Sequence, residues 1–266
     1  MKKLILSALL LLSVCLSAQI TDNKIITDRP NQTESPNTVP KGTIQIESGL
    51  LFERSEITSG LSQHRNAFPT NLFRIGIAKK LELRVINELV SYNTINNSTQ
   101  EEIGKVTGTE NLQIGLKYQI TNDDAAIVVG LMLEGRVPTG SRGISNRLYG
   151  VVSRLSLAYN LPENKSLGAN LGYNNVNLDF NDEGLVRYGQ GNLTYTLVYG
   201  VSISDRVGLY VEAFGDYVEF KDWENNMDAG MTYLISDNIQ LDYSYGWGLN
   251  RVMNYHAVGI SIILPK

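Results

Sequence analysis

Apolar and polar side chains alternate with a period of two residues along most of the chain after residue 43. Between Leu112 and Ile120, for example, every second residue is apolar and the residues between them are polar or glycine. This periodicity predicts β-strands with one apolar and one polar face. Such stretches lie near residues 44–53, 71–78, 81–90, 110–120, 127–133, 149–159, 167–173, 193–201, 207–213, 227–235, 239–247 and 258–262. We therefore predict an all-β chain with about 12 antiparallel strands.

The connections between the predicted strands alternate in length. Short polar turns lie near residues 78–80, 121–124, 161–164, 204–206 and 236–238, and we expect longer polar loops near residues 54–68, 92–108, 138–146, 179–186 and 219–226. Short turns at one end and long loops at the other are typical of outer-membrane barrels, whose strands are long because they cross the bilayer at a tilt. The pattern favours a single antiparallel transmembrane β-barrel. A soluble β-sandwich, with the apolar faces packed together, is the alternative.

Four tyrosines on the apolar face favour the barrel. Tyr118, Tyr159, Tyr199 and Tyr233 each stand a few residues before a short turn. In a membrane barrel these rings would lie at one height, where the ring reaches the lipid headgroups and the hydroxyl reaches water.

The first 18 residues have the organisation of a cleaved signal peptide. Two lysines precede a short apolar run, and small residues stand before the predicted cleavage after Ala18. The single cysteine, Cys15, lies in this segment, so the mature chain has no thiol for a disulfide or a zinc site. Lipid attachment at Cys15 is the alternative. We predict an exported protein of the cell outer membrane.

Composition and charge narrow the set of partners. Charged residues make up 19% of the chain, and it has 24 glycines and 14 tyrosines, which suits strands and turns rather than disorder or a coiled coil. The net charge is -4 without a basic cluster, which argues against nucleic acid. Outer-membrane lipid and a small-molecule solute are the expected partners, and the sequence leaves the oligomeric state open.

The polar face of the predicted strands carries charges of both signs and is expected to line the barrel lumen. The candidate lumen-lining residues are Glu47, Arg74, Glu82, Arg84, Glu88, Lys117, Glu134, Arg136, Arg154, Glu212, Asp228 and Asp242. Unpaired buried charges are unfavourable, so the interior is either wet or ion-paired. A structural salt-bridge network and a selectivity surface for a polar or amphipathic solute both fit these residues.

Residues 19–42 do not follow the strand pattern, and we separate them from the barrel of residues 43–266. Their prolines exclude a helix and an internal strand. The segment either folds into the periplasmic mouth as a plug or stays outside as a loose tail. As a plug, it would pair Asp28, Arg29 and Glu34 with charges of the lumen.

The same segment resembles a known family. The motifs that carry the resemblance are Thr27-Asp28-Arg29-Pro30, Thr33-Glu34-Ser35-Pro36, Val39-Pro40-Lys41-Gly42 and Gln45-Ile46-Glu47, with Pro138-Thr139-Gly140 as a weaker likeness. They are similar to the family described as "Putative MetA-pathway of phenol degradation". The resemblance implies an exported outer-membrane barrel transporter and a loose link to aromatic compounds, although no phenol-handling motif is readable.

No catalytic, metal or cofactor site is predicted, so we do not expect an enzyme. The chain has two histidines, His64 and His256, and lacks a Gly-x-Ser-x-Gly elbow. An outer-membrane hydrolase is therefore the weakest of the three functions considered. The predicted function is passive uptake of small molecules, aromatic or amphipathic, and the alternative is a non-conducting structural or adhesion barrel that displays its extracellular loops.

Overall fold

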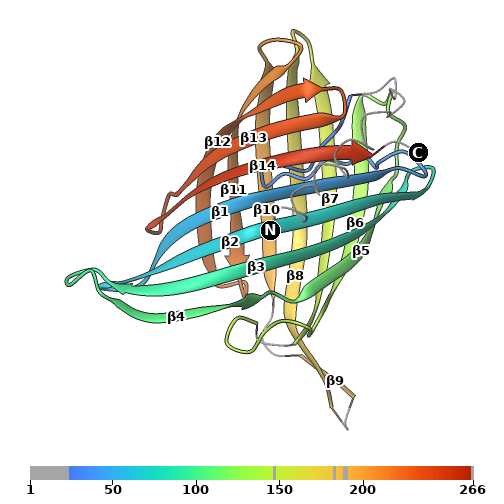
Figure 1. Ribbon diagram of the computed structural model, residues 1–266. Coiled ribbons are helices and arrows are strands. Elements are labelled where there is room, and N and C mark those ends of the chain that lie inside the picture. The colour runs from blue at the N-terminus through green and yellow to red at the C-terminus, as the bar shows by residue number, and fades with distance from the viewer. Residues whose placement is uncertain (1–23, 146–147, 182–183, 188–190, 265–266) are drawn as a thin grey trace, which may run out of the picture.

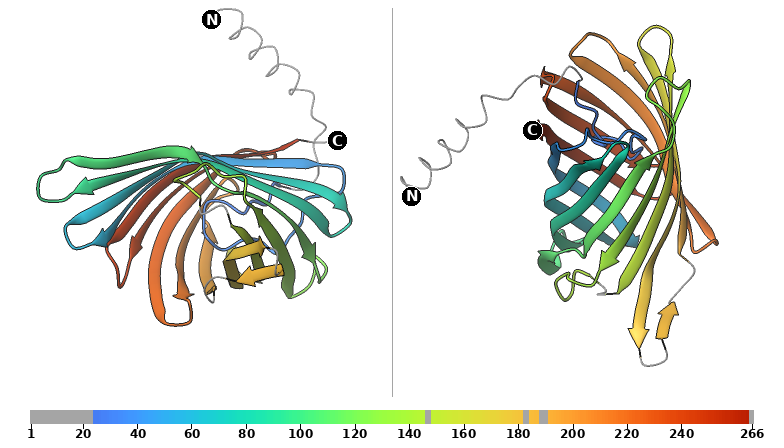
Figure 2. Two further views of the ribbon diagram at one scale, coloured as in Figure 1. Left: turned by 90° about the horizontal axis from the view of Figure 1, so that it is seen from below. Right: turned by 90° about the vertical axis from the view of Figure 1, so that its right-hand side faces the viewer.

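The computed structural model describes residues 24–145, 148–181, 184–187 and 191–264. The predicted signal peptide, residues 1–18, lies outside these ranges. The described chain forms a β-barrel that encloses a short N-terminal stretch (Figures 1 and 2). None of the described residues belongs to a helix with the length and apolar character needed to span a membrane.

All strands belong to one sheet. They are β1 (Ile44–Thr58), β2 (Leu61–Ala78), β3 (Leu81–Asn96), β4 (Glu102–Thr109), β5 (Leu112–Gln119), β6 (Ile127–Val137), β7 (Tyr149–Leu161), β8 (Lys165–Asn181), β9 (Gly184–Arg187), β10 (Asn192–Ser202), β11 (Val207–Val218), β12 (Asp222–Ser236), β13 (Ile239–Gly248) and β14 (Met253–Leu264). Neighbouring strands of the sheet pair antiparallel, β14 pairs with β1, and β8 pairs with β10, so the wall closes on itself.

The wall has twelve strand positions. The sheet contains 14 strands, but β4 and β5 both pair with β3 and form one interrupted strand, while β9 pairs only with the far end of β8. This confirms the predicted antiparallel barrel and its strand number. The closed single-layer wall also excludes the β-sandwich, which needs two packed layers.

The prediction of several long loops was wrong, because the strands continue through these regions. β1 runs to Thr58 and β2 begins at Leu61, with Gly60 at a φ of 83° in the tight turn between them. Strand extensions likewise occupy much of the regions near residues 92–108, 179–186 and 219–226. Beyond the lipid both faces of the wall meet water, so apolar alternation is no longer required there although the backbone ladder continues.

The two faces of the wall differ sharply in chemistry. Outward-facing Leu133 and Leu171 are 58% and 54% exposed, whereas Arg74 and Glu82 on the inner face are 0% exposed. The four tyrosines before the short turns are all exposed on the outside. This inside-out arrangement suits a wall that meets hydrocarbon outside and encloses polar groups.

An arginine substitution tests whether the outer face meets hydrocarbon. Leu171→Arg, within the apolar band of β8, should lower the free energy of unfolding in phospholipid vesicles by about 2–4 kcal/mol. The control Ile57→Arg, in the strand extension and 50% exposed, should lower it by only about 0–1 kcal/mol. Guanidinium titration measures both, and equally small losses would contradict the lipid contact.

Candidate functional site

Residues 24–42, here called the N-terminal segment, run inside the barrel at the end that carries the short turns (Figure 2). The Ile25 N–H donates to the Asp237 carbonyl over 2.7 Å, and the Gly42 N–H donates to the Gly76 carbonyl over 2.7 Å. The segment also touches the wall closely, because a Cβ on Gly76 would lie 2.0 Å from the Pro40 carbonyl oxygen. Glycine at position 76 therefore makes room for the segment.

Asp28 lies at the centre of a cluster of cationic side chains from the wall. Its carboxylate accepts hydrogen bonds from Lys117 Nζ at 2.8 and 2.9 Å and from Arg84 Nη1 at 2.5 Å, and Arg74 Nε lies 3.5 Å away. Burial raises the pKa of Asp28, but the charges of Arg74, Lys117 and Arg84 outweigh burial and hold this pKa well below its usual range. Asp28 is therefore a stable anion between three cations.

Wall carboxylates also bind the backbone of the segment. Glu47 accepts the N–H groups of Asp28 and Arg29 at 3.0 and 2.9 Å, and Glu212 accepts those of Gln32 and Thr33, both at 2.7 Å. A Pro-rich segment without strand partners leaves its buried N–H groups unpaired unless side chains accept them. The acids of the inner face fill this role.

Three further ion pairs hold Arg29 and Glu34 of the segment. Arg29 Nη2 lies 2.9 Å from Asp242, and the Glu34 carboxylate bridges Arg84 at 2.7 Å and Arg154 at 2.5 Å. All three charged residues proposed for a plug thus contact charges of the wall.

The structure brings most of the candidate lumen residues together around this segment. The residues that contact it directly are Glu47, Arg74, Glu82, Arg84, Lys117, Arg154, Glu212 and Asp242. Glu134 joins through Arg84 at 2.8 Å, and Asp228 binds the Tyr255 hydroxyl. Glu88 and Arg136 lie outside this cluster.

Sequence reasoning missed uncharged members of the site. Asn170 accepts the Glu34 N–H at 2.7 Å and donates to the Glu34 carbonyl at 3.0 Å, and Gln45 donates to the Ile26 carbonyl at 2.9 Å. The side chains of Asn170 and Gln45 both point into the barrel from their strands. The same alternation would have found them if amides had been counted with the charges.

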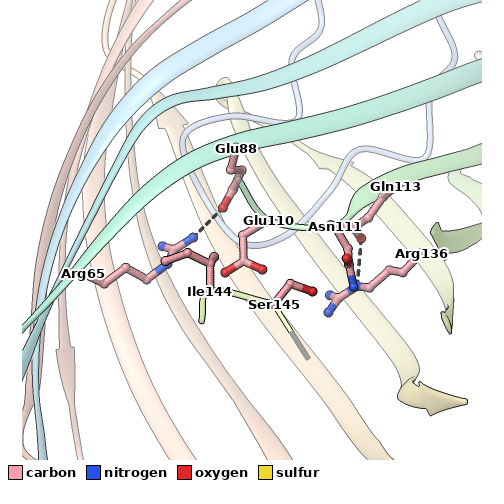
Figure 3. A pocket seen from close by; sticks show the side chains of 8 residues that line it. All are labelled: Arg65, Glu88, Glu110, Asn111, Gln113, Arg136, Ile144 and Ser145. Atoms are coloured by element: carbon pink, nitrogen blue, oxygen red, sulfur yellow. Dashed lines mark hydrogen bonds and ion pairs between the residues drawn. The ribbon is translucent and has the colours of Figure 1, made fainter. Parts of the chain in front are cut away.

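The interior of the barrel contains two neighbouring cavities, of which one adjoins the cluster. One, of about 450 Å³, lies beside the N-terminal segment and extends along the inner face of the wall to Asp216. The other, of about 500 Å³, lies near the interruption between β4 and β5 (Figure 3). They share Glu88, Gln113 and Arg136 in their linings, so they are neighbours in the interior. The described residues hold no group of three or more His, Cys, Asp or Glu suited to a metal ion.

Comparisons with known proteins agree with this architecture. The family model described as "Putative MetA-pathway of phenol degradation" matches residues 27–264. The fold is similar to the COG4313 outer membrane channel from Pseudomonas putida F1, with a TM-score of 0.66 and 12% identity over 88% of this chain and 99% of that chain. It is also similar to the transport unit of the autotransporter AIDA-I from Escherichia coli, with a TM-score of 0.53 and 11% identity over 84% and 90%. These likenesses are of fold alone, and the search of curated proteins finds no match.

Removal of the Asp28 charge should release the N-terminal segment. Asp28→Asn leaves Arg84 and Lys117 buried without this anion, and breaking such a pair costs about 3 kcal/mol or more, roughly a 100-fold loss of amide protection. Hydrogen exchange of residues 24–42 measures the effect. Glu163→Gln, which removes an exposed carboxylate from its pair with Lys165, is the matched control and should leave the exchange unchanged. Equal protection in both variants would contradict the role of Asp28.

The depressed pKa of Asp28 also predicts how docking depends on pH. The charged form stabilises docking fully above the ordinary pKa of 3.8, and this contribution is lost as the pH falls below that value. A spin label at Asn31→Cys reports the docked fraction with and without Asp28→Asn. The difference in docked fraction between the two proteins should stay constant from about pH 8 to about pH 5 and shrink below pH 3.8. A difference that shrinks near neutral pH would contradict this assignment.

Proposed function

Because the chain belongs to the "Putative MetA-pathway of phenol degradation" family, we propose that it is an outer-membrane channel for passive passage of small molecules. The similar fold of the Pseudomonas putida outer membrane channel supports this proposal. In the proposed orientation of this chain, the end of the barrel with the short turns faces the periplasm. The N-terminal segment is the plug of that end.

The observation that carries the proposal is the polar interior of the barrel. Its wall has buried charges of both signs, and a cavity of about 450 Å³ opens beside the segment. Val152, Tyr195 and Phe214 add apolar surface to this cavity, so the lining fits a polar or amphipathic solute. Binding along such a path must stay weak enough for the solute to leave.

The ion pairs of Asp28, Arg29 and Glu34 support a closed resting state. These residues neutralise wall charges and fill the periplasmic end. Passage through that end therefore requires the segment to move, which makes it a gate as well as a structural element.

Deletion of residues 19–40 tests the channel and its plug together. In planar bilayers the deletion variant should conduct at least several-fold more than the full mature protein, because the periplasmic end is then open. Glu163→Gln should conduct like the full protein. Equal conductance of the deletion variant and the full protein would reject the plug. Absence of conductance from both, with the barrel folded and inserted, would favour the non-conducting structural or adhesion barrel.

A further inference from the structure

The cavity of about 500 Å³ lies beside a break in the barrel wall, whose residues Glu110 and Asn111 form part of its lining (Figure 3). β4 ends at Thr109 and β5 begins at Leu112, so Glu110 and Asn111 lie between two strands that otherwise share one position. Irregular positions of this kind are over-represented near functional sites, where they aim a side chain. Here the break directs Glu110 into the cavity (Figure 3).

A loop holds the break in a defined geometry. The Leu112 N–H donates to Thr139 Oγ1 at 3.0 Å, and the Gly140 N–H donates to Asn111 Oδ1 at 3.0 Å. The Ser141 N–H donates to the Thr109 carbonyl at 2.9 Å. The Pro138-Thr139-Gly140 motif thus anchors the loop, and the same loop adds Ile144 and Ser145 to the lining. The cavity is built by specific contacts rather than left by loose packing.

Two opposite charges of the lining, Arg136 and Glu110, form no direct ion pair among the described residues, although the charge of Glu110 acts on Arg136. Arg136 Nε donates to Gln113 Oε1 at 3.2 Å, and the Glu110 carboxylate accepts the Tyr92 hydroxyl at 3.1 Å. The other charged pair of the cavity, Arg65 and Glu88, is joined at 2.5 Å. Glu110 lies between that pair and the side of the cavity formed by Asn111, Gln113 and Arg136 (Figure 3).

We propose that this cavity binds small zwitterionic solutes, such as free amino acids, on their way through the barrel. The solute carboxylate pairs with the fork of the Arg136 guanidinium, and the ammonium group pairs with Glu110. A simple anion would leave Glu110 repelling it, a simple cation would meet Arg136, and a neutral solute would satisfy neither charge. The proposal rests on the proposed channel function and names its substrate class.

The remaining lining agrees with this class of solute. Ile144 is the one aliphatic side chain among the eight lining residues, and Asn111, Gln113 and Ser145 supply polar groups. An aromatic hydrocarbon would find little apolar surface there. The volume lies within the roughly 300–1,000 Å³ range of small-molecule sites.

Uptake of two isomers into proteoliposomes tests the inference. Alanine and lactamide share one molecular formula, so a size filter treats them alike, but alanine is a zwitterion and lactamide is neutral. At low solute concentration the full mature protein should take up alanine about fivefold faster than lactamide, corresponding to about 1 kcal/mol. In the same full mature chain, Arg136→Gln or Glu110→Gln should bring the ratio close to one. Arg54→Gln and Glu102→Gln, which remove exposed charges of the same kind, should preserve it.

The outcomes separate this inference from the channel function. Equal uptake of both isomers would overturn the zwitterion site and leave the channel standing. A preference for alanine that survives both cavity variants would also overturn it. Uptake of neither isomer by inserted barrels would instead contradict the channel, and the zwitterion site with it.

Discussion

Every charge buried inside this barrel needs an opposite charge or a hydrogen-bond partner, and the N-terminal segment supplies many of these partners. Arg84 is 1% exposed and pairs with Asp28, Glu34, Glu82 and Glu134. Two of these four anions come from the segment. Wall and segment therefore form one electrostatic unit, in which neither is satisfied alone.

The segment and the wall complement each other in backbone chemistry as well. Prolines keep the segment from joining the sheet, so its backbone N–H groups donate hydrogen bonds to side chains of the wall instead. Glu47, Glu82 and Glu212 accept them. This division leaves the two ends of the interior different in character. The end with the short turns is packed with paired charges, whereas the cavities near Glu110 and Arg136 keep charges available for a solute.

The sequence predicted the strand number and both faces of the wall, because lipid requires an apolar residue at every second position. It failed in the regions near residues 54–68, 92–108 and 219–226, where water on both faces removes that requirement while the strands continue. The inward phase of Arg74 and Lys117 was also readable. The sequence also offered Asp28 as a partner for lumen charges, but it could not say which cations Asp28 meets, since Lys117 lies 89 positions away and reaches Asp28 only through the register of the closed barrel. The break at Glu110 was not predicted, because the residues near 92–108 were expected to form a loop and the strand was expected to begin at residue 110, whereas β4 occupies Glu102–Thr109.

A double-mutant cycle between Asp28 and Lys117 tests the central claim, that charges of the segment and of the wall hold each other in place. The free energy of docking of the segment is measured for the parent protein, Asp28→Asn, Lys117→Met and the double variant. Residues in one buried ionic network couple by about 0.5–3 kcal/mol, and the short contact of this pair places the expected coupling at the upper part of that range, about 2 kcal/mol or more. Effects that add within about 0.5 kcal/mol would contradict the account.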